Sequence, residues 1–509
     1  MTNHLADALG LADQGRQHRP FATLTGGRRL SYGDVDTLSA RFAGCLIALG
    51  VKPGDRVAVQ VEKSIEALML YLGTVRAGAV FLPLNTAYTP AEIAFFTRDA
   101  EPALIVCDPS KAEALTPVAA DTGARLETMG ADGASGTLFA HVPAAGAPAV
   151  VARGPDDLAA ILYTSGTTGR SKGAMLSHDN LASNARVLVD CWRFTAQDRL
   201  IHALPIYHTH GLFVACNVTL VAGASLVWLP RFAPDEVFAA MADGASALMG
   251  VPTFYTRLLG DPRLTAEACR SMRLFVAGSA PLLAETHRQF EARTGHAILE
   301  RYGMTEASMI CSNPYKGERR PGTVGLPLPG VEVRVTDAED NGPSGATLAP
   351  GQIGMLRVRG PNVFRGYWKL PEKTAEELSD DGWFVTGDLA TVGEDGYVQI
   401  VGRGKDLIIS GGFNVYPKEV ESEIDRLDGV VESAVIGVPH PDFGEGVVAV
   451  VVPAAEAPRE PDRIVGALGD RLAKFKQPKR VIFVDALPRN TMGKVQKKNL
   501  RETYADLFA

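Results

Sequence analysis

The sequence predicts an α/β fold: a large N-terminal domain of parallel α/β sheets with a small β subdomain, followed by a small α+β C-terminal domain. Apolar strand-like runs alternate with helical patterns in the N-terminal part. Short strand-like segments separated by Gly and Pro begin beyond Gly322, and a further pattern of predicted helices and strands begins at Pro417. A chain of 509 residues also exceeds what one hydrophobic core usually supports. About two to four domains are therefore expected.

The N-terminal part shows the pattern of parallel βαβ units. Residues 56–61 and 104–107 are apolar strand-like runs, and residues 64–77 between them have the apolar spacing of a helix. Residues 128–157 are rich in Ala, Gly and Pro and are periodic in neither sense, so we expect a surface connection there. This alternation predicts parallel sheets covered by helices.

The β subdomain and the C-terminal unit are predicted from shorter signals. Residues 331–335 and 354–358 alternate polar and apolar side chains, as short strands do. The C-terminal unit is predicted to contain a helix over 417–427, strands over 431–438 and 446–452, a helix near 463–473 and a strand over 480–484. Together these elements indicate a compact α+β unit.

Composition excludes several classes of protein. Hydrophobic residues make up 46% of the chain and charged residues 21%, as in soluble globular proteins, so neither disorder nor a fibrous repeat is expected. The net charge of −7 argues against a surface built for nucleic acid. The six cysteines are too far apart for a CxxC metal site or a dense disulfide framework, so we expect reduced cytosolic thiols.

Two features bear on location. The N-terminus lacks a basic start followed by an apolar run, so no secretory signal is visible and the cytoplasm is expected. Residues 211–230 carry no charge and are long enough to cross a bilayer. Gly223 splits this stretch into a helix-like part and a short strand over 225–229, so we expect no membrane span.

Residues 163–173, Tyr-Thr-Ser-Gly-Thr-Thr-Gly-Arg-Ser-Lys-Gly, have the chemistry of a phosphate-binding loop. They follow an apolar strand and precede a helical pattern over 180–190. Glycines permit close backbone approach, consecutive N–H groups can bind an anion, and hydroxyls and Lys172 add donors and charge. The loop is not a Walker A sequence, because no Gly-Lys-Ser/Thr follows. A Gly/Ser linker is the alternative, but such linkers seldom stand between a strand and a helix.

The C-terminal tail is basic in an acidic protein. Residues 471–509 contain ten Lys or Arg and three acidic residues, a balance of +7. Such a tail either meets an anionic ligand or is a solvated basic helix end, and charge pattern alone does not separate the two.

Seven motifs stand in order along the chain, and they resemble those of the adenylate-forming acyl-CoA synthetases, relatives of firefly luciferase and of nonribosomal peptide adenylation domains. The motifs are residues 163–173, Pro205-Ile206-Tyr207-His208-Thr209-His210-Gly211, Gly278-Ser279-Ala280-Pro281-Leu282, Glu300-Arg301-Tyr302-Gly303-Met304-Thr305-Glu306, Gly387-Asp388, Gly402-Arg403-Gly404-Lys405-Asp406 and Pro488-Arg489-Asn490-Thr491-Met492-Gly493-Lys494. The resemblance covers nearly the whole chain. It implies a mobile C-terminal domain and the use of ATP, Mg²⁺ and coenzyme A (CoA).

The resemblance assigns residues to the phosphates and the metal. Around the β- and γ-phosphates of ATP it places Thr164, Ser165, Gly166, Thr167, Thr168, Gly169 and Lys172. It implies that Thr305 meets the α-phosphate and that Glu306 helps to hold Mg²⁺. A Glu that opens a helix also favours the local dipole, so a purely structural role is the alternative for Glu306.

The nucleoside site and the catalytic lysine are likewise implied by the resemblance. Tyr302 and Gly303 border adenine, Asp388 binds the ribose hydroxyls, and Arg403 lies near the same sugar. Lys494 matches the family's catalytic lysine, whose ammonium can bridge the incoming carboxylate and the α-phosphate. One more lysine in a basic tail is its alternative. Its context also resembles the site at which relatives are switched off by acetylation, which removes the charge.

Substrate choice rests on Arg301, which stands directly before the Tyr-Gly-Met-Thr-Glu motif. Many acyl-CoA synthetases carry an uncharged residue there, so a cation implies an anionic acid. A guanidinium can bind the distal carboxylate of malonate through two charged hydrogen bonds, each worth roughly 1.5–3 kcal/mol. His210, Ser279 and Arg257 are expected to help. A structural ion pair of Arg301 with Glu300 or another acid is the alternative.

His208 and His210 form an HxH pair, which we expect on one face of a strand. No third ligand is near, so these imidazoles are interpreted as ordinary polar residues and not as metal ligands. In the family, His208 lines the acyl pocket and gates the passage through which CoA arrives.

Two half-reactions imply two positions of the C-terminal domain, because Lys494 must leave before the thiol of CoA can approach. Lys405 occupies the family's hinge position, so we expect domains over 1–403 and 404–509. Gly411 and Gly412 are expected to line the pantetheine tunnel.

The sequence therefore predicts a cytosolic ligase that converts malonate, ATP and CoA into malonyl-CoA, AMP and pyrophosphate through malonyl-adenylate, with methylmalonate as a further acid. Similarity to the malonate-activating members of the family is strongest across 202–211, 250–259 and 413–419. The alternatives are a synthetase for another short-chain or aromatic acid, a carrier-protein adenylation domain, and a non-catalytic AMP-binding protein. The chain ends 15 residues after Lys494, which argues against a carrier, and its intact lysine and acid set argues against a scaffold.

Overall fold

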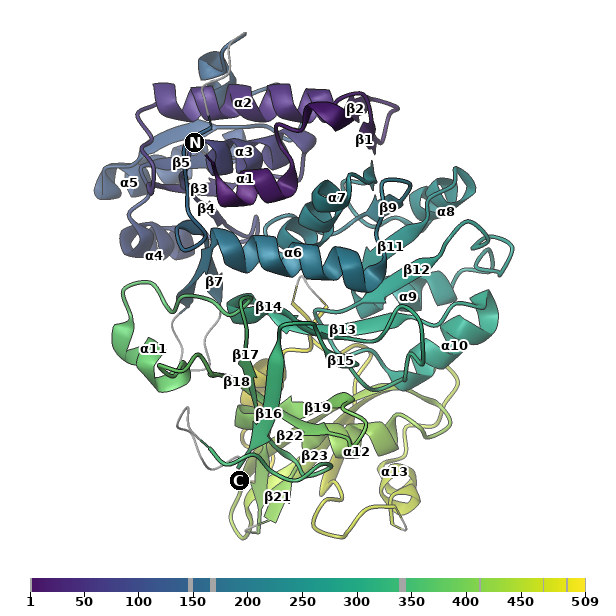
Figure 1. Cartoon of the computed structure of the whole chain (residues 1–509). Coiled ribbons are helices and arrows are strands. Elements are labelled where there is room, and N and C mark those ends of the chain that lie inside the picture. Colours follow the sequence, from purple (N-terminus) through teal and green to yellow (C-terminus); the bar gives the residue numbers. More distant parts are fainter. Residues whose placement is uncertain are drawn as a thin grey trace.

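A computed structural model arranges the chain in four sheets, two large ones in the N-terminal part and two smaller ones toward the C-terminus (Figure 1). It describes residues 2–144, 150–164, 171–337, 345–411, 413–469, 471–490 and 493–508. The first of the large sheets has six strands in the order β6-β5-β3-β4-β7-β8. Their bounds are β3 (Arg56–Gln60), β4 (Val80–Pro83), β5 (Leu104–Cys107), β6 (Arg125–Thr128), β7 (Leu158–Thr164) and β8 (Lys172–Ser177). Neighbouring strands run parallel except β7 and β8, which are antiparallel.

The second large sheet has nine strands in the order β15-β14-β13-β12-β11-β9-β10-β1-β2. Their bounds are β1 (Pro20–Leu24), β2 (Arg29–Ser31), β9 (Arg199–His202), β10 (Ser225–Trp228), β11 (Ala247–Gly250), β12 (Leu274–Ala277), β13 (Leu299–Met304), β14 (Ser308–Ser312) and β15 (Leu326–Pro327). The strands from β13 to β1 are parallel to their neighbours, and β2, β14 and β15 are antiparallel. The parallel strands of both sheets need crossover connections, which most of the helices supply.

The helices of the N-terminal part begin at sequence signals that satisfy their free N–H groups. Ser31, Thr89 and Ser177 each form a capping box at the start of α2, α4 and α6. The α-helices up to the C-terminal unit are α1 (His4–Leu9), α2 (Tyr32–Ala48), α3 (Ile65–Arg76), α4 (Pro90–Ala100), α5 (Ala112–Thr122), α6 (His178–Trp192), α7 (Asn217–Ala222), α8 (Pro234–Ala242), α9 (Pro252–Leu259), α10 (Ala284–Thr294) and α11 (Pro371–Glu377). The shorter turns are 3-10 helices η1 (Gln14–Arg16), η2 (Pro109–Lys111), η3 (Thr137–His141), η5 (Thr305–Ala307) and η6 (Gly404–Asp406), and the π-helix η4 (His210–Cys216).

The β subdomain is a four-stranded antiparallel sheet in chain order, with β16 (Glu332–Thr336), β17 (Gly354–Arg359), β18 (Phe384–Val392) and β19 (Val398–Arg403). The C-terminal sheet follows the order β21-β20-β23-β22, with β24 beside β23. Its elements are β20 (Ile408–Ser410), β21 (Phe413–Val415), α12 (Pro417–Ile424), β22 (Val430–His440), β23 (Gly444–Pro453), α13 (Pro461–Ala467), β24 (Arg480–Phe483) and α14 (Lys497–Thr503). In Figure 1 this unit, coloured yellow-green, lies below β13 and α10.

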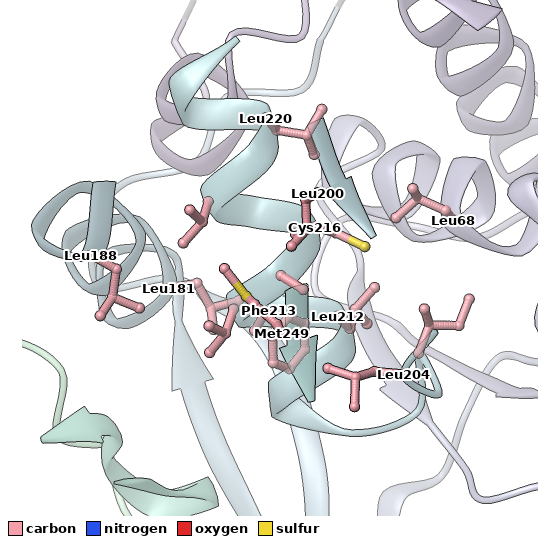
Figure 2. Packing of buried hydrophobic residues seen from close by; sticks show 14 of the residues in the cluster. Leu68, Leu181, Leu188, Leu200, Leu204, Leu212, Phe213, Cys216, Leu220 and Met249 are labelled. Atoms are coloured by element: carbon pink, nitrogen blue, oxygen red, sulfur yellow. The ribbon is translucent and has the colours of Figure 1, made fainter. Parts of the chain in front are cut away.

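One hydrophobic core joins the two large sheets. It contains Val57 and Phe81 from the six-stranded sheet together with Leu200 and Leu248 from the nine-stranded sheet. Figure 2 shows a central part of it. There Leu212, Phe213 and Cys216 of η4 and Leu220 of α7 lie among Leu181 and Leu188 of α6, Leu200 of β9, Met249 of β11 and Leu68 of α3. Because one core is shared, the ends of strands from both sheets are held in a defined relation to one another.

The predicted fold class is confirmed, with corrections at particular elements. The predicted helix near 463–473 ends at Ala467, because Gly466 and Gly469 make helix formation costly there. The uncharged stretch 211–230 divides at Gly223 as predicted, but its helical part starts as the π-helix η4. In the described parts of the chain, no helix is both long enough and apolar enough to cross a membrane.

Candidate active site

The candidate active site lies where the carboxyl ends of strands from both large sheets meet. Thr164 is the last residue of β7 in one sheet, and Glu306 follows β13 of the other. The Oγ1 atom of Thr164 donates a hydrogen bond to Oε1 of Glu306 across 3.2 Å. Ligands of open α/β sheets bind beyond the carboxyl ends of the strands, so this junction is where a ligand is expected.

Lys172 stands beside the phosphate-loop motif and is already paired. It is the first residue of β8 and is buried. Its Nζ donates to Oε1 of Glu377 at 3.0 Å and lies 4.0 Å from the centroid of the Tyr367 ring. Ser165, Gly166, Thr167, Thr168 and Gly169, which the sequence assigns to phosphates, lie outside the described residues. The charge of Lys172 is thus held at the edge of the loop by a carboxylate.

Tyr367 connects that carboxylate to Glu306. Its hydroxyl is 2.7 Å from Oε2 of Glu377 and 3.3 Å from Oε1 of Glu306. Burial raises the pKa of Glu306, and Lys172 and Arg403 oppose this rise. Sequence reasoning missed Tyr367 and Glu377. In the sequence alone, Glu377 cannot be told from a solvent-exposed charge on a helix. Only the contact between α11 and Lys172 of β8 reveals its partner.

Glu306 suits a magnesium site of the kind that depends on a nucleotide. Mg²⁺ is usually held by one or two carboxylates together with phosphate oxygens and water. In the described residues no group of three or more His, Cys, Asp or Glu side chains could hold a metal alone. One buried carboxylate, beside a hydroxyl donor and close to Lys172, fits a metal that arrives with the phosphates of ATP.

Asp388 and Arg403 face each other because they are cross-strand partners in β18 and β19. The Nε atom of Arg403 is 2.7 Å from Oδ1 of Asp388, which is buried. The hydroxyl of Tyr302 donates to the other carboxylate oxygen of Asp388. The structure therefore brings together three of the residues that the sequence assigns to the nucleoside, and Gly303 follows Tyr302 on β13.

Lys494 of the C-terminal unit reaches the same region. Its side chain is exposed to solvent. The protein around it and the positive charge of Arg403 nevertheless lower the pKa of Lys494 to about 8, and the negative charge of Asp388 opposes this shift. Gly493 next to it has φ +75°, and a Cβ there would come within 3.2 Å of Cγ2 of Thr253 on α9. The C-terminal unit therefore brings Lys494 near Arg403 and Asp388.

Arg301 forms the centre of a second cluster, away from the phosphate residues. It is 3% exposed, and its Nε and Nη2 atoms have no hydrogen-bond partner among the described residues. A Cβ on Gly278 would lie 2.4 Å from Cζ of Arg301, so the guanidinium rests directly on a glycine. Burial lowers the pKa of Arg301 to about 9, which leaves it charged at neutral pH.

Ser279 and His210 complete this cluster. Ser279 has φ +71°, a strained value for a residue with a side chain. Its Oγ lies 3.1 Å from Nδ1 of His210. Burial lowers the pKa of His210 well below its usual range, and the positive charge of Arg301 lowers it further. A buried guanidinium without a carboxylate partner, flanked by a hydroxyl and an imidazole, is suited to an anion.

The alternative of an ion pair between Arg301 and Glu300 does not fit this geometry. The two residues are neighbours on β13, so their side chains point to opposite faces of the sheet. Oε1 of Glu300 accepts a hydrogen bond from the backbone N–H of Leu282 at 3.3 Å, and burial raises the pKa of Glu300 to about 8.

His208 and Arg257, the remaining residues predicted near the acid, lie in different surroundings. His208 lines a small cavity with Tyr163, Tyr207 and Thr305, and burial lowers its pKa to about 4. Arg257 is exposed on α9 and makes no hydrogen bond or ion pair with a described residue. The expectation that His208 and His210 share a strand is wrong. Strand β9 ends at His202, and the pair lies in the turn and π-helix that follow.

The predicted hinge and tunnel residues lie where the β subdomain passes into the C-terminal unit. Lys405 is the middle residue of η6, directly after β19. The neighbouring Asp406 binds Arg501 of α14, with 2.7 Å between Oδ1 and Nη1. Gly411 has φ +60° and its Cα faces the ring of Phe443, and Gly412 lies outside the described residues.

Comparison with known proteins identifies the family. The model of the AMP-binding enzyme family matches residues 11–368, and that of the AMP-binding enzyme C-terminal domain matches residues 419–494. The chain therefore belongs to the AMP-binding enzyme family, as the motifs predict.

Individual relatives and solved structures give a more specific comparison than the family models do. A malonate–CoA ligase of Arabidopsis thaliana is 34% identical over 94% of this chain and 85% of its own length. A feruloyl-CoA synthase of Amycolatopsis sp is 38% identical over 95% and 96%. ATP-bound MatB of Rhodopseudomonas palustris is 60% identical with a TM-score of 0.96 over 100% of this chain and 99% of that one, and its apo form gives 0.85 over the same shares. The arrangement seen here is thus closer to that of the ATP-bound form.

Proposed function

We propose that this protein is an AMP-forming malonate–CoA ligase. It joins malonate to CoA with release of AMP and pyrophosphate, through malonyl-adenylate, and takes methylmalonate as a second acid. The observation that carries the proposal is the buried Arg301 guanidinium, which pairs with no carboxylate of the described residues and stands beside Ser279 and His210. Membership of the AMP-binding enzyme family and the relatives that ligate acids to CoA support the acid–thiol ligase class, with ATP, Mg²⁺ and CoA as its small-molecule partners.

Charge decides the preference for a diacid. One carboxylate of malonate reacts with ATP, and the other is still negative when it enters the cluster around Arg301. Two charged hydrogen bonds from a guanidinium contribute roughly 1.5–3 kcal/mol each. An acid without the distal carboxylate would leave Arg301 buried and unsatisfied, so the pocket both attracts the diacid and disfavours a monoacid.

The first half-reaction brings two anions together. An oxygen of the near carboxylate attacks the α-phosphorus of ATP, and the bond to pyrophosphate breaks. Lys494 and Thr305 stabilise charge at the α-phosphate, and Lys172 stabilises the departing phosphates after leaving Glu377. Glu306 would hold Mg²⁺, which supplies further positive charge to the phosphates.

Nucleoside binding follows from the pair on β18 and β19. Asp388 presents a buried carboxylate whose orientation is set by Arg403 and Tyr302, and it accepts hydrogen bonds from the two ribose hydroxyls. Tyr302 and Gly303 border adenine. In the second half-reaction, Gly411 and Gly412 line the tunnel for pantetheine, and His208 gates its inner end.

A panel of acids tests the proposal. Purified protein is assayed with ATP, Mg²⁺, CoA and malonate, methylmalonate, acetate, benzoate or ferulate, with AMP release as the readout. Malonate is expected to give the highest kcat/KM. Higher values with acetate, benzoate or ferulate would overturn the malonate assignment and leave a ligase for another short-chain or aromatic acid.

Removing the guanidinium should damage malonate use selectively. For Arg301→Ala we expect kcat/KM for malonate to fall about 100-fold, which corresponds to about 3 kcal/mol, because two charged hydrogen bonds are lost. Gly278→Ala should also raise KM for malonate, since its Cβ would displace the guanidinium. ATP KM should stay unchanged in both variants. A proportional loss for ATP would indicate general damage instead.

The lowered pKa of Lys494 predicts an alkaline limit to adenylation. The ammonium loses its proton above about pH 8, so malonate-dependent exchange of pyrophosphate into ATP should decline there, well below the ordinary lysine value of 10.5. Lys494→Arg keeps its charge and should show a lower rate without that decline. An identical alkaline profile in the variant would show that another group titrates. Because CoA is absent from this exchange, its thiol cannot contribute.

We propose that the domains divide into 1–403 and 404–509 with Lys405 as the hinge. Proline restricts φ to about −65°, so Lys405→Pro should limit rotation of the C-terminal domain. Formation of malonyl-adenylate is expected to persist, while thioester formation from supplied malonyl-adenylate slows about tenfold or more. Lys405→Ala, which removes the side chain without the restriction, is the matched control. Equal second-step rates in the two variants would contradict the hinge.

We further propose that acetylation of Lys494 switches the enzyme off and that the enzyme is cytoplasmic. Acetylation removes the charge that adenylation needs. Mass spectrometry of protein from its native cells should find acetyl-Lys494 under some growth condition, and cell fractionation should find the protein in the cytoplasm. Absence of the modification under every condition would refute the regulation.

A further inference from the structure

Lys63, which has no part in the reaction outlined above, joins the two large sheets. It follows β3, and its Nζ donates to Nδ1 of His202 at 2.9 Å, to the carbonyl oxygen of His202 at 2.8 Å and to that of Leu229 at 2.6 Å. Nζ also lies 4.4 Å from the centroid of the Trp228 ring, against which the His202 ring stacks. Three acceptors match the three donors of an ammonium.

This contact decides which nitrogen of His202 carries the proton. An ammonium has no acceptor, so Nδ1 of His202 must accept and the proton resides on Nε2. Nε2 donates in turn to the carbonyl oxygen of Gly211 at 2.8 Å. Burial and the positive charge of Lys63 keep the pKa of His202 well below its usual range, so the ring stays neutral.

Gly211 links this relay to the acid cluster. It follows His210 in the π-helix η4, and a Cβ on Gly211 would lie 2.0 Å from the carbonyl oxygen of Pro205. The peptide is therefore confined on one side by Pro205 and held on the other by His202. In Figure 2 the next residues, Leu212 and Phe213, are packed into the core, which leaves little freedom to the start of this helix. π-Helices recur at functional sites.

Burial lowers the pKa of Lys63 to about 7, an unfavourable setting for a purely structural link. No carboxylate of the described chain pairs with it, although its ammonium is turned toward buried His202 and Trp228. Burying an ammonium without a counter-charge costs free energy that an apolar contact between the sheets would not.

We infer that Lys63 and His202 are positioning residues for the acid site: through the Gly211 carbonyl they hold His210 beside Ser279 and Arg301. This inference rests on the proposed use of malonate. The contacts run from Lys63 to His202, from His202 to Gly211, and along the chain to His210. Loss of either residue lets η4 shift and should weaken recognition of the distal carboxylate while leaving the nucleotide site intact.

Lys63→Met tests the relay against Arg76→Met at the other end of α3. Arg76 is also buried, remote from η4 in sequence, and donates to the carbonyl oxygen of Leu11 at 2.7 Å and to the carboxylate of Asp36, so it reports the general loss of a buried cation. We expect Lys63→Met to raise KM for malonate about tenfold with ATP KM unchanged, and Arg76→Met to alter neither. Melting temperatures of both variants separate destabilisation from recognition.

His202 offers a second, conservative test. Gln at this position keeps one acceptor and one donor, whereas Leu keeps only the volume. His202→Gln should therefore retain a KM for malonate close to that of the unaltered protein, and His202→Leu should match Lys63→Met. Equal malonate KM values in Lys63→Met, His202→Leu and the unaltered protein would overturn the inference.

The acid panel distinguishes this failure from that of the function itself. If the unaltered protein does not prefer malonate, the proposed function fails. If it does prefer malonate and the preference over acetate is the same in Lys63→Met, only the relay fails.

Discussion

A buried guanidinium that meets no carboxylate in the described part of the chain is the constraint around which the proposed acid site is organised. Arg301 can occupy its place on β13 only because residue 278 has no side chain, and the strained Ser279 that follows turns its hydroxyl toward His210. Each of these features is unfavourable alone. Together they are consistent with a pocket whose unfavourable features are compensated when the distal carboxylate of an acid pairs with Arg301. Such a pocket would separate a small diacid from a monoacid of almost the same shape.

The phosphate side of the site uses the opposite arrangement, in which the charges are paired in advance. Glu377 holds Lys172, and Tyr367 joins Glu377 to Glu306, so three charged groups keep fixed positions without a nucleotide. A preorganised site of this kind loses little free energy to reorganisation when phosphates arrive. Phosphate oxygens would have to compete with Glu377 for Lys172, and the same carboxylate can take the lysine back as pyrophosphate leaves.

The position of the C-terminal unit connects these two regions. Lys494 lies near the Asp388–Arg403 pair, and η6, with Lys405, lies directly after the strand that ends at Arg403. The residues proposed for ribose binding, for the hinge and for catalysis are therefore close in space, although Lys494 is far from the other two in sequence. The TM-score of 0.96 to ATP-bound MatB, against 0.85 to its apo form, is consistent with an arrangement suited to adenylate formation.

Local signals in the sequence sufficed for much of this protein. Alternating strand and helix patterns predicted the α/β class, and the motif residues Asp388, Arg403, Thr164 and Glu306 could be named because each lies in a short segment with recognisable chemistry. Arg301 could be singled out because it is a cation before an otherwise familiar motif. In each case neighbouring residues carried the information.

Contacts between distant segments could not be read in the same way. The pairing of Lys172 with Glu377, the exposure of Arg257, the turn and π-helix that hold His208 and His210, and the link from Lys63 to His202 all depend on how elements far apart in the sequence pack together. Hydrophobic periodicity records which side of an element is buried, but not which element covers it. The sequence by itself thus determined the fold class, the family and the type of chemistry, whereas only the tertiary structure decided which charges of the described residues are paired and which, like that of Arg301, are not, because pairing depends on contacts between distant segments.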